Sequence, residues 1–262
     1  MATLTNDAVL AVAELLGVQT LPTVLAVGPR QDSRAAFTAA RAAALRELRD
    51  TGLVDSYDDI DLDIGAALMI LARPERQLAA RVCTESGVRR VCVARRGVEH
   101  AVAVRSGDDI EVCTLWADED GASLARPILD VLGPAEPADI TGFGCPTDEL
   151  SRRLDDVARP SEFAEALHGV AVDERAAIEF GMALSCCRAR TEIVAYAHDE
   201  GCITRSSGAV AVYDTERGRI VASPGLAADL RLWSTFTPGS AHRVAQAVTA
   251  LIATLPGGRW LP

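Results

Sequence analysis

The sequence predicts an α+β fold with a central antiparallel β-sheet, built by an internal duplication with quasi-twofold symmetry. The tetrapeptide Ala-Val-Ala-Val occurs at residues 101–104 and again at 209–212. Each copy is followed by a glycine turn, a Leu-Trp pair, a second glycine and an apolar helical run. In each half, strand-like segments are grouped apart from helix-like segments, which is typical of antiparallel pairing. We therefore expect one domain over residues 1–262, with half-repeats at about 1–133 and about 146–262 that share one sheet.

The first 74 residues carry helix signals. Helices with capping residues and apolar periodicity are expected over residues 5–17, 32–52 and 61–72. The apolar segment 21–27 lies between the first two of them and is bounded by Pro22 and Gly28. This segment is therefore predicted to be a short strand.

A meander of strands follows the third helix. The expected strands cover residues 76–83, 88–94, 98–104 and 110–115. Gly87, Gly97 and Gly107 separate them at a spacing of about ten residues, which indicates tight turns between antiparallel strands. Alternation places Val102 and Val104 on one face of the sheet, opposite the alanines beside them.

The remaining elements repeat this plan. The helix after the meander is expected to hold Pro127 in its first turn, where a missing N–H costs little. The Pro- and Gly-rich stretch 133–146 joins the halves, with Ile140 and Phe143 as apolar anchors. Second-half helices are expected over 147–158, 161–168 and 173–184, and strands over 190–198, 202–205, 209–213, 219–222 and 230–236. A last helix begins at the capping residue Ser240.

The composition limits the partners and the location. The chain has 37 acidic residues against 26 basic ones, all of them Arg, and a net charge of −11. Nucleic acid needs a basic footprint, so we expect no nucleic-acid partner. No apolar run reaches the roughly 18 residues that span a bilayer, and residues 1–17 lack the basic start of a signal peptide. We therefore expect no membrane insertion and a cytoplasmic location.

Motifs for catalysis, metals and cofactors are weak. The cysteines number seven, an odd count, and none stands in a Cys-x-x-Cys spacing, which argues against a disulfide framework or a zinc ribbon. The histidines are His100, His168, His198 and His242, and no two of them have metal-ligand spacing on a helix. The segment 142–144 lacks the third glycine of a dinucleotide fingerprint. We expect no catalytic residue, no metal and no cofactor.

Several soft motifs occur in an order that resembles a known family. In the second half they are Gly201–Arg205, Ala209–Thr215, Gly218–Val221, Trp233–Phe236 and Pro238-Gly239. In the first half they are Leu45 with Thr51-Gly52-Leu53, Asp61 to Leu71, and Arg73-Pro74. Together they make the chain similar to the EspG family of ESX secretion-associated proteins, over nearly its whole length.

The resemblance implies a cytosolic chaperone of type VII (ESX) secretion in mycobacteria and related actinobacteria, not an enzyme. Such a chaperone binds PE–PPE heterodimers at the apolar tip of the PPE helical bundle, keeps this cargo soluble and directs it to its own secretion system. The resemblance also implies a central antiparallel sheet with two helical bundles. The free protein is expected to be a monomer or a weak homodimer.

The resemblance places the cargo on the exposed face of the sheet and on the C-terminal helices. The candidate contact residues are apolar strand residues, an arginine rim and two turns of the first half. They are Val210, Val212, Trp233 and Phe236, the rim residues Arg205 and Arg219, and Glu85, Val88, Arg95 and Arg96 in the turns. The short strand-joining turns leave the identity of the partner open.

Two other classes of protein stay open. A protein-binding adaptor or scaffold without a role in secretion is the first, and a genomic neighbourhood without ESX ATPase and PE/PPE genes would favour it. A small-ligand enzyme with a site between the half-repeats is the second. It would need a deep pocket lined by His198, Asp199 and Glu200.

Overall fold

The computed structural model describes residues 2–118, 121–154, 157, 159–199, 201–227 and 230–262. In the first half these form β1 (Ala2–Thr5), α1 (Asn6–Leu15), the 3₁₀ turn η1 (Thr23–Leu25), α2 (Arg34–Asp50), α3 (Leu62–Ala72), β2 (Arg76–Thr84), β3 (Gly87–Arg96), β4 (Glu99–Ser106), β5 (Asp109–Leu115) and α4 (Gly121–Leu132). In the second half they form β6 (Phe143–Pro146), α5 (Thr147–Leu154), α6 (Pro160–His168), α7 (Glu174–Leu184), β7 (Cys187–Asp199), β8 (Cys202–Arg205), β9 (Val210–Thr215), β10 (Gly218–Leu226), β11 (Leu232–Pro238) and α8 (Ala241–Ala253).

The strands form one antiparallel sheet, as predicted. Its order is β1-β5-β4-β3-β2-β7-β9-β10-β11-β6, with β8 paired to β7. The halves meet where β2 pairs with β7, in a continuous register from Arg76–Ala197 to Thr84–Ala189. Apart from η1 and β8, the order of the described elements is the same in both halves, and the strand order is the same from either edge. This topology is consistent with the quasi-twofold duplication.

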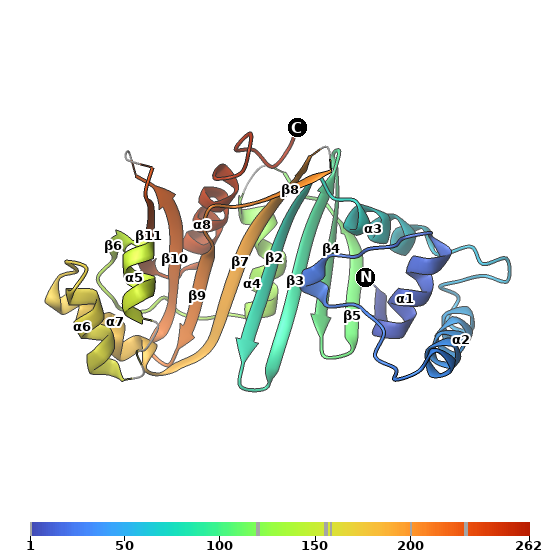
Figure 1. The fold of residues 1–262 in the computed structure, drawn as a ribbon, viewed down its shortest axis with the longest axis horizontal. Helices are drawn as coiled ribbons and strands as arrows, with labels where there is room; N and C mark the ends of the chain where they lie inside the picture. Colours follow the sequence, from blue (N-terminus) through green and yellow to red (C-terminus); the bar gives the residue numbers. More distant parts are fainter. Residues whose placement is uncertain (1, 119–120, 155–156, 158, 200, 228–229) are drawn as a thin grey trace.

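Helices cover the two faces of the sheet differently (Figure 1). One face is covered by α4 and α8, which bury a cluster that includes Val102, Val212 and Leu251. On the other face, α1 and α3 cover the strands of the first half, and α5 to α7 cover the outer strands of the second. Val102 and Val104 face α4, while the alanines beside them face α3, so the predicted alternation is confirmed.

Most predicted helix boundaries are confirmed because they depend on local capping. The hydroxyls of Thr5, Ser33 and Ser240 accept hydrogen bonds from backbone N–H groups of the first turns of α1, α2 and α8. Gly52, just past α2, has a φ of 72°, a conformation that glycine adopts without strain. The helix predicted over 147–158 is α5, which ends at Leu154; residues 155–156 and 158 lie outside the described residues.

Two local predictions are wrong. Residues 21–27 form the turn η1 instead of a strand, because Ala26 takes a left-handed conformation with a φ of 50° and strand residues bind the carbonyl groups of the turn. Pro127 lies inside α4 instead of in its first turn. The helix begins as early as Gly121 because it packs closely on α8: a Cβ atom at Gly121 would lie 2.6 Å from the carbonyl oxygen of Ala245. This packing offsets the cost of an interior proline.

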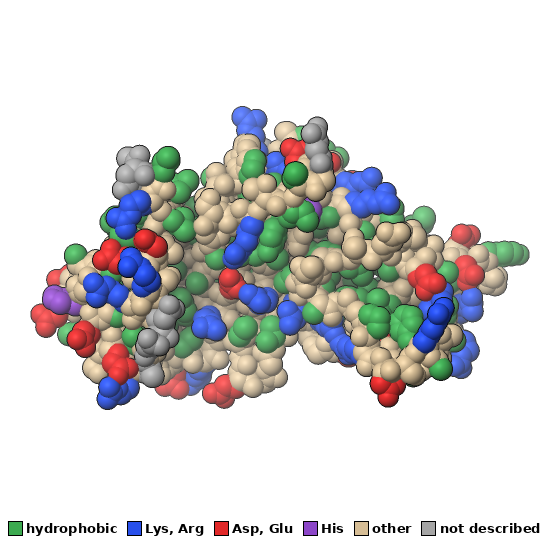
Figure 2. All heavy atoms as spheres, viewed as in Figure 1, with side chains coloured by type: hydrophobic (Ala, Val, Ile, Leu, Met, Phe, Trp, Pro, Cys, Tyr) green, Lys and Arg blue, Asp and Glu red, His purple; other side chains and the backbone are tan. Residues whose placement is uncertain are grey.

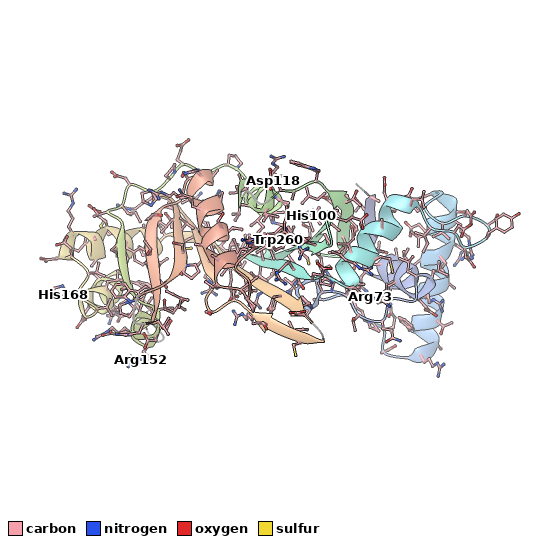
Figure 3. All side chains as sticks on the ribbon, turned by 90° about the horizontal axis from the view of Figure 1, so that it is seen from above. Arg73, His100, Asp118, Arg152, His168 and Trp260 are labelled. Carbon is pink, nitrogen blue, oxygen red and sulfur yellow. The ribbon has the colours of Figure 1, made fainter. Side chains whose placement is uncertain are left out.

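The chain after α8 is fastened to the first half of the sheet. The indole Nε1 of Trp260 donates a 2.9 Å hydrogen bond to His100 Nε2 on β4, and the two rings stack (Figure 3). The guanidinium of Arg76 on β2 donates to the carbonyl groups of Pro256 and Arg259. The C-terminal segment therefore stabilises contacts between the two half-repeats.

This attachment predicts a pH-dependent stability. Burial, and then the charge of Arg95, lower the pKa of His100 below its usual 6.5, and burial also lowers the pKa of His198. The unfolded chain therefore takes up protons first, and stability is lost as the pH falls below 6.5. We expect a loss of about 1 kcal/mol between about pH 7.5 and about pH 5.5 from His100, since its protonation removes the acceptor of the Trp260 bond. Urea unfolding at both pH values measures it.

The matched variants are His100→Gln and His242→Gln. Gln at position 100 keeps an oxygen acceptor that does not titrate, so the pH dependence should become flatter. His242 lies exposed in the first turn of α8, so its replacement should change little. An unchanged pH dependence in His100→Gln would contradict the role given to His100.

Candidate partner-binding surface

The central strands have an open face between the two helical bundles. It lies opposite α4 and α8, and the bundles stand at either side of it (Figure 2). We call this surface the saddle. It consists of the outward-facing residues of β2, β3 and β7 with the adjoining end of β8: Ala79, Arg81, Cys83, Val88, Arg90, Arg190, Glu192, Val194, Tyr196 and Arg205. Between the two bundles, the described helices leave this stretch of the sheet open on this face.

Two hollows lie side by side on the saddle, and both have β2 and β7 as their floor. The first, the polar hollow, has a volume of about 360 Å³ and borders η1. It is lined by Thr23, Val24, Ala79, Arg81, Arg90, Glu192, Val194, Tyr196 and Arg205. The second, the apolar hollow, has a volume of about 480 Å³ and borders the α5–α7 bundle. The bundle contributes the apolar residues Leu154, Val157, Phe163 and Leu184 to its wall, and the strands contribute Tyr213 together with the cations Arg188 and Arg190.

The polar hollow contains an ionic network. Glu192 binds Arg81 through Oε2 at 2.5 Å and Arg205 through Oε1 at 3.5 Å. Its hydrogen bond raises the pKa of Arg81 above the usual value, so this guanidinium stays charged. Arg90 donates to the carbonyl oxygen of Val24 in η1 at 3.2 Å. Three cations therefore face one carboxylate, which gives the hollow a positive excess in an acidic chain.

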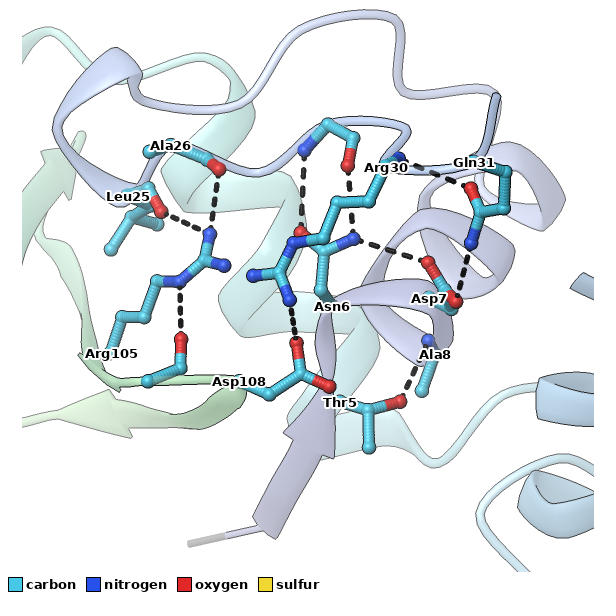
Figure 4. Close-up of polar contacts among 12 residues, drawn as sticks. Thr5, Asn6, Asp7, Ala8, Leu25, Ala26, Arg30, Gln31, Arg105 and Asp108 are labelled. Atoms are coloured by element: carbon cyan, nitrogen blue, oxygen red, sulfur yellow. Dashed lines mark hydrogen bonds and ion pairs between the residues drawn. The ribbon is translucent and has the colours of Figure 1, made fainter. Parts of the chain in front are cut away.

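The wall beside the polar hollow is an irregular loop held by buried side chains (Figure 4). Arg105 of β4 donates to the carbonyl groups of Leu25 at 2.7 Å and Ala26 at 2.6 Å. The amide of Asn6 donates to the carbonyl of Gly28 at 3.0 Å and accepts from the N–H of the same residue at 3.4 Å. These bonds satisfy backbone groups that no helix or strand pairs, so η1 keeps its place beside the sheet.

The structure buries five of the candidate contact residues. Val210 and Val212 lie in the core beneath α8, and Phe236 packs against Phe143 and Phe180. Arg219 pairs with Asp214 inside the protein, and Arg95 pairs with Glu75. The side chains of Val210, Val212, Phe236, Arg219 and Arg95 cannot meet a partner in this structure. For Val210, Val212 and Arg219 the reason is that β9 and β10 are covered on both faces, so both alternating sets of side chains are buried.

The other five candidates are exposed but not gathered together. Arg205 lines the polar hollow, and Val88 lies on the saddle with 40% of its surface exposed. Trp233 shares the opposite face with Val221 and α8, according to the register of β10 and β11. Glu85 and Arg96 lie near opposite ends of β3. Only Arg205 and Val88 therefore lie on the saddle.

Most residues of the saddle are not among the candidates that the sequence predicts. Four of its residues occupy alternate positions of their strands: Arg81, Arg90, Glu192 and Tyr196. Alternation predicts which residues share one face of the sheet, but it does not predict whether helices cover that face. In the sequence, nothing distinguishes Phe163 from the other apolar residues of α6. The missing information is the pairing of β2 with β7, which brings Arg81 to Glu192 across 111 positions of sequence.

The enzyme alternative needs a deep pocket between the half-repeats that is lined by His198, Asp199 and Glu200. The two hollows lie on the β2–β7 ladder that joins the half-repeats, and neither His198 nor Asp199 lines them. Glu200 lies outside the described residues. In the described part of the chain, no three His, Cys, Asp or Glu side chains are grouped to hold a metal ion. No helix among the described residues is long and apolar enough to cross a bilayer.

The fold and the saddle define a two-lobed α+β protein with an open binding face. Residues 5–250 match the sequence model of the EspG family, and the chain belongs to this family. It is 33% identical to the ESX-3 secretion-associated protein EspG3 of Mycolicibacterium smegmatis, over 99% of this chain and 88% of that protein. It is 29% identical to the ESX-1 secretion-associated protein EspG1 of Mycobacterium tuberculosis, over 98% of this chain and 88% of that protein.

A solved structure has the same fold. It is the M. tuberculosis type VII secretion system chaperone EspG5 in complex with a PE25–PPE41 dimer, and it matches with a TM-score of 0.82. The match covers 99% of this chain and 98% of that chain, at 20% identity. The predicted family and the predicted fold class are both confirmed.

Proposed function

We propose that this protein is a chaperone of an ESX secretion system that binds a PE–PPE dimer and covers the apolar end of the PPE bundle with its saddle. The observation that carries the proposal is the open sheet face between two helical bundles in a chain of the EspG family. The similar EspG5 structure, solved with a PE25–PPE41 dimer, supports it. We further propose that the protein acts in the cytoplasm and catalyses no reaction.

The two hollows suit this task. An apolar bundle end needs a concave apolar surface with an anchoring pocket, and the apolar hollow supplies one between Phe163 and Tyr213. A chaperone must also release its cargo, which favours a contact with a polar rim over a fully apolar one. Arg205 and Val88 belong to the proposed contact surface, while Glu85, Arg96 and Trp233 remain candidates for contacts outside it.

Co-expression with the PE and PPE proteins of the same organism tests the proposal. We expect a soluble complex of one chaperone with one PE–PPE dimer that survives gel filtration, whereas the free chaperone elutes as a monomer or a weak dimer. Absence of a complex with every PE–PPE pair of that organism would overturn the proposed function. Capture of unrelated proteins instead would favour the adaptor alternative.

A further inference from the structure

We propose, on the basis of the function above, that the polar hollow binds a carboxylate of the cargo, namely an Asp or Glu side chain at the end of the PPE bundle. Chaperoning an apolar tip requires only apolar contact. The polar hollow adds a second, charge-based contact beside it, and this contact gives the chaperone a means to choose among cargoes.

The first argument is the charge of the hollow. Arg81, Arg90 and Arg205 line it together with one carboxylate, that of Glu192. The chain as a whole carries a net charge of −11, so its surface repels anions in general. A local excess of cations on the proposed contact face therefore favours one anionic group delivered by a bound protein.

The second argument is the unused hydrogen-bonding capacity of the three guanidinium groups. Among the described residues, Arg81 and Arg205 each use one Nη atom, on Glu192, and Arg90 uses one, on the carbonyl of Val24. A guanidinium has five N–H donors. The contact of Arg205 with Glu192 is long at 3.5 Å, so this side chain can turn to a better acceptor at small cost. An incoming carboxylate would meet several free donors.

The third argument is the size and setting of the hollow. Its floor contains Ala79 and Val194, and its volume of about 360 Å³ suits a single side chain. The fork shape of the guanidinium matches a carboxylate, which it binds through paired hydrogen bonds. The apolar hollow lies next along the same two strands, so a cargo segment with an apolar residue there can bring a neighbouring acidic residue to Arg81 and Arg205.

In this arrangement Glu192 occupies part of the site in the free protein. It holds Arg81 and Arg205 over the hollow, and it also competes with the carboxylate of the cargo. Replacing it should therefore have the opposite effect on binding from replacing an arginine. This difference in sign separates a carboxylate site from a surface ion network without a role in binding.

The test measures the affinity for a co-purified PE–PPE dimer by titration calorimetry. Arg81→Gln and Arg205→Gln should each weaken binding by about three- to tenfold, and Glu192→Gln should strengthen it by a similar factor. Raising the salt from about 50 to about 500 mM should weaken the wild type more than the arginine variants. The affected side chains are exposed, so circular dichroism and melting curves should show intact folds.

The exposed pair Arg49–Asp58 supplies matched controls, because it lies outside the saddle and is also joined at 2.5 Å. Arg49→Gln and Asp58→Asn repeat the charge changes and should leave the affinity within about twofold. Wild-type protein that binds no PE–PPE dimer would overturn the proposed function. Wild-type protein that binds, with Glu192→Gln unchanged or weaker, would overturn only the carboxylate site.

Discussion

Phe163→Asp is expected to weaken the complex with a PE–PPE dimer by at least about 100-fold, which corresponds to about 2.7 kcal/mol. Phe163 is a partly exposed aromatic residue of α6 that lines the apolar hollow. Aromatic anchors in such pockets dominate the energy of protein interfaces. The substitution also puts a carboxylate where the complex excludes water, which adds a desolvation cost. Titration calorimetry or the loss of the complex in gel filtration measures the effect.

Ile178→Asp is the matched control. Ile178 lies on α7 with 45% of its surface exposed, in a separate groove between α6 and α7. Ile178→Asp replaces an apolar residue with an acidic one on the same helical bundle, as Phe163→Asp does, but outside the saddle. We expect an affinity within about threefold of the wild type. If Ile178→Asp weakened the complex more than Phe163→Asp, the cargo surface would be the α6–α7 groove, and the assignment to the saddle would be wrong.

The elements that the sequence predicts correctly are those fixed by nearby residues. Thr5 and Ser240 cap helices through hydroxyl groups within three residues of the N–H groups they bind. The meander follows from glycine turns and alternation, which also act over short distances. By contrast, η1 depends on Arg90 and Arg105, which come from strands far along the chain. The local pattern of apolar residues between Pro22 and Gly28 therefore cannot predict the hydrogen bonds to these two arginines.

The candidate binding surface was harder to predict, because the burial of a strand residue depends on which helices cover each face of the sheet. Val210 and Val212 alternate as a half-exposed strand would, but β9 is covered on both faces, by α8 on one and by α7 on the other. The uncovered strands are β2 and β7, at the junction of the two half-repeats. Duplication predicts that the halves share a sheet, but it does not say where the helices leave that sheet open.

The two halves have the same order of elements, but they contribute different walls to the saddle. The first half supplies η1 with its polar carbonyl groups, and the second supplies apolar residues of α5, α6 and α7, namely Leu154, Phe163 and Leu184. In addition, β8 occurs only in the second half and brings Arg205 to the polar hollow. The two sides of the saddle therefore differ chemically, so in the proposed complex the bundle end would meet them in a preferred orientation.

Arg219→Met is expected to lower the free energy of unfolding by about 3–5 kcal/mol. Arg219 is 3% exposed and binds both carboxylate oxygens of Asp214, through Nε at 2.5 Å and Nη2 at 3.2 Å. Its Nη2 atom also donates to the carbonyl of Gly133 at 3.0 Å, where the connection between the halves begins. Methionine keeps the apolar stem but leaves the carboxylate of Asp214 without its partner.

Urea unfolding measures this loss, and two further variants identify its cause. Asp214→Asn in the Arg219→Met background removes the unpaired charge, so it should recover part of the lost stability. Arg188→Met breaks an exposed pair with Glu216 and should cost about 0.5 kcal/mol or less. If Arg219→Met cost no more than Arg188→Met, the connection 133–146 would be held without the Arg219 side chain, by its backbone bonds and its apolar contacts. The side-chain pair would then contribute nothing to joining the two halves.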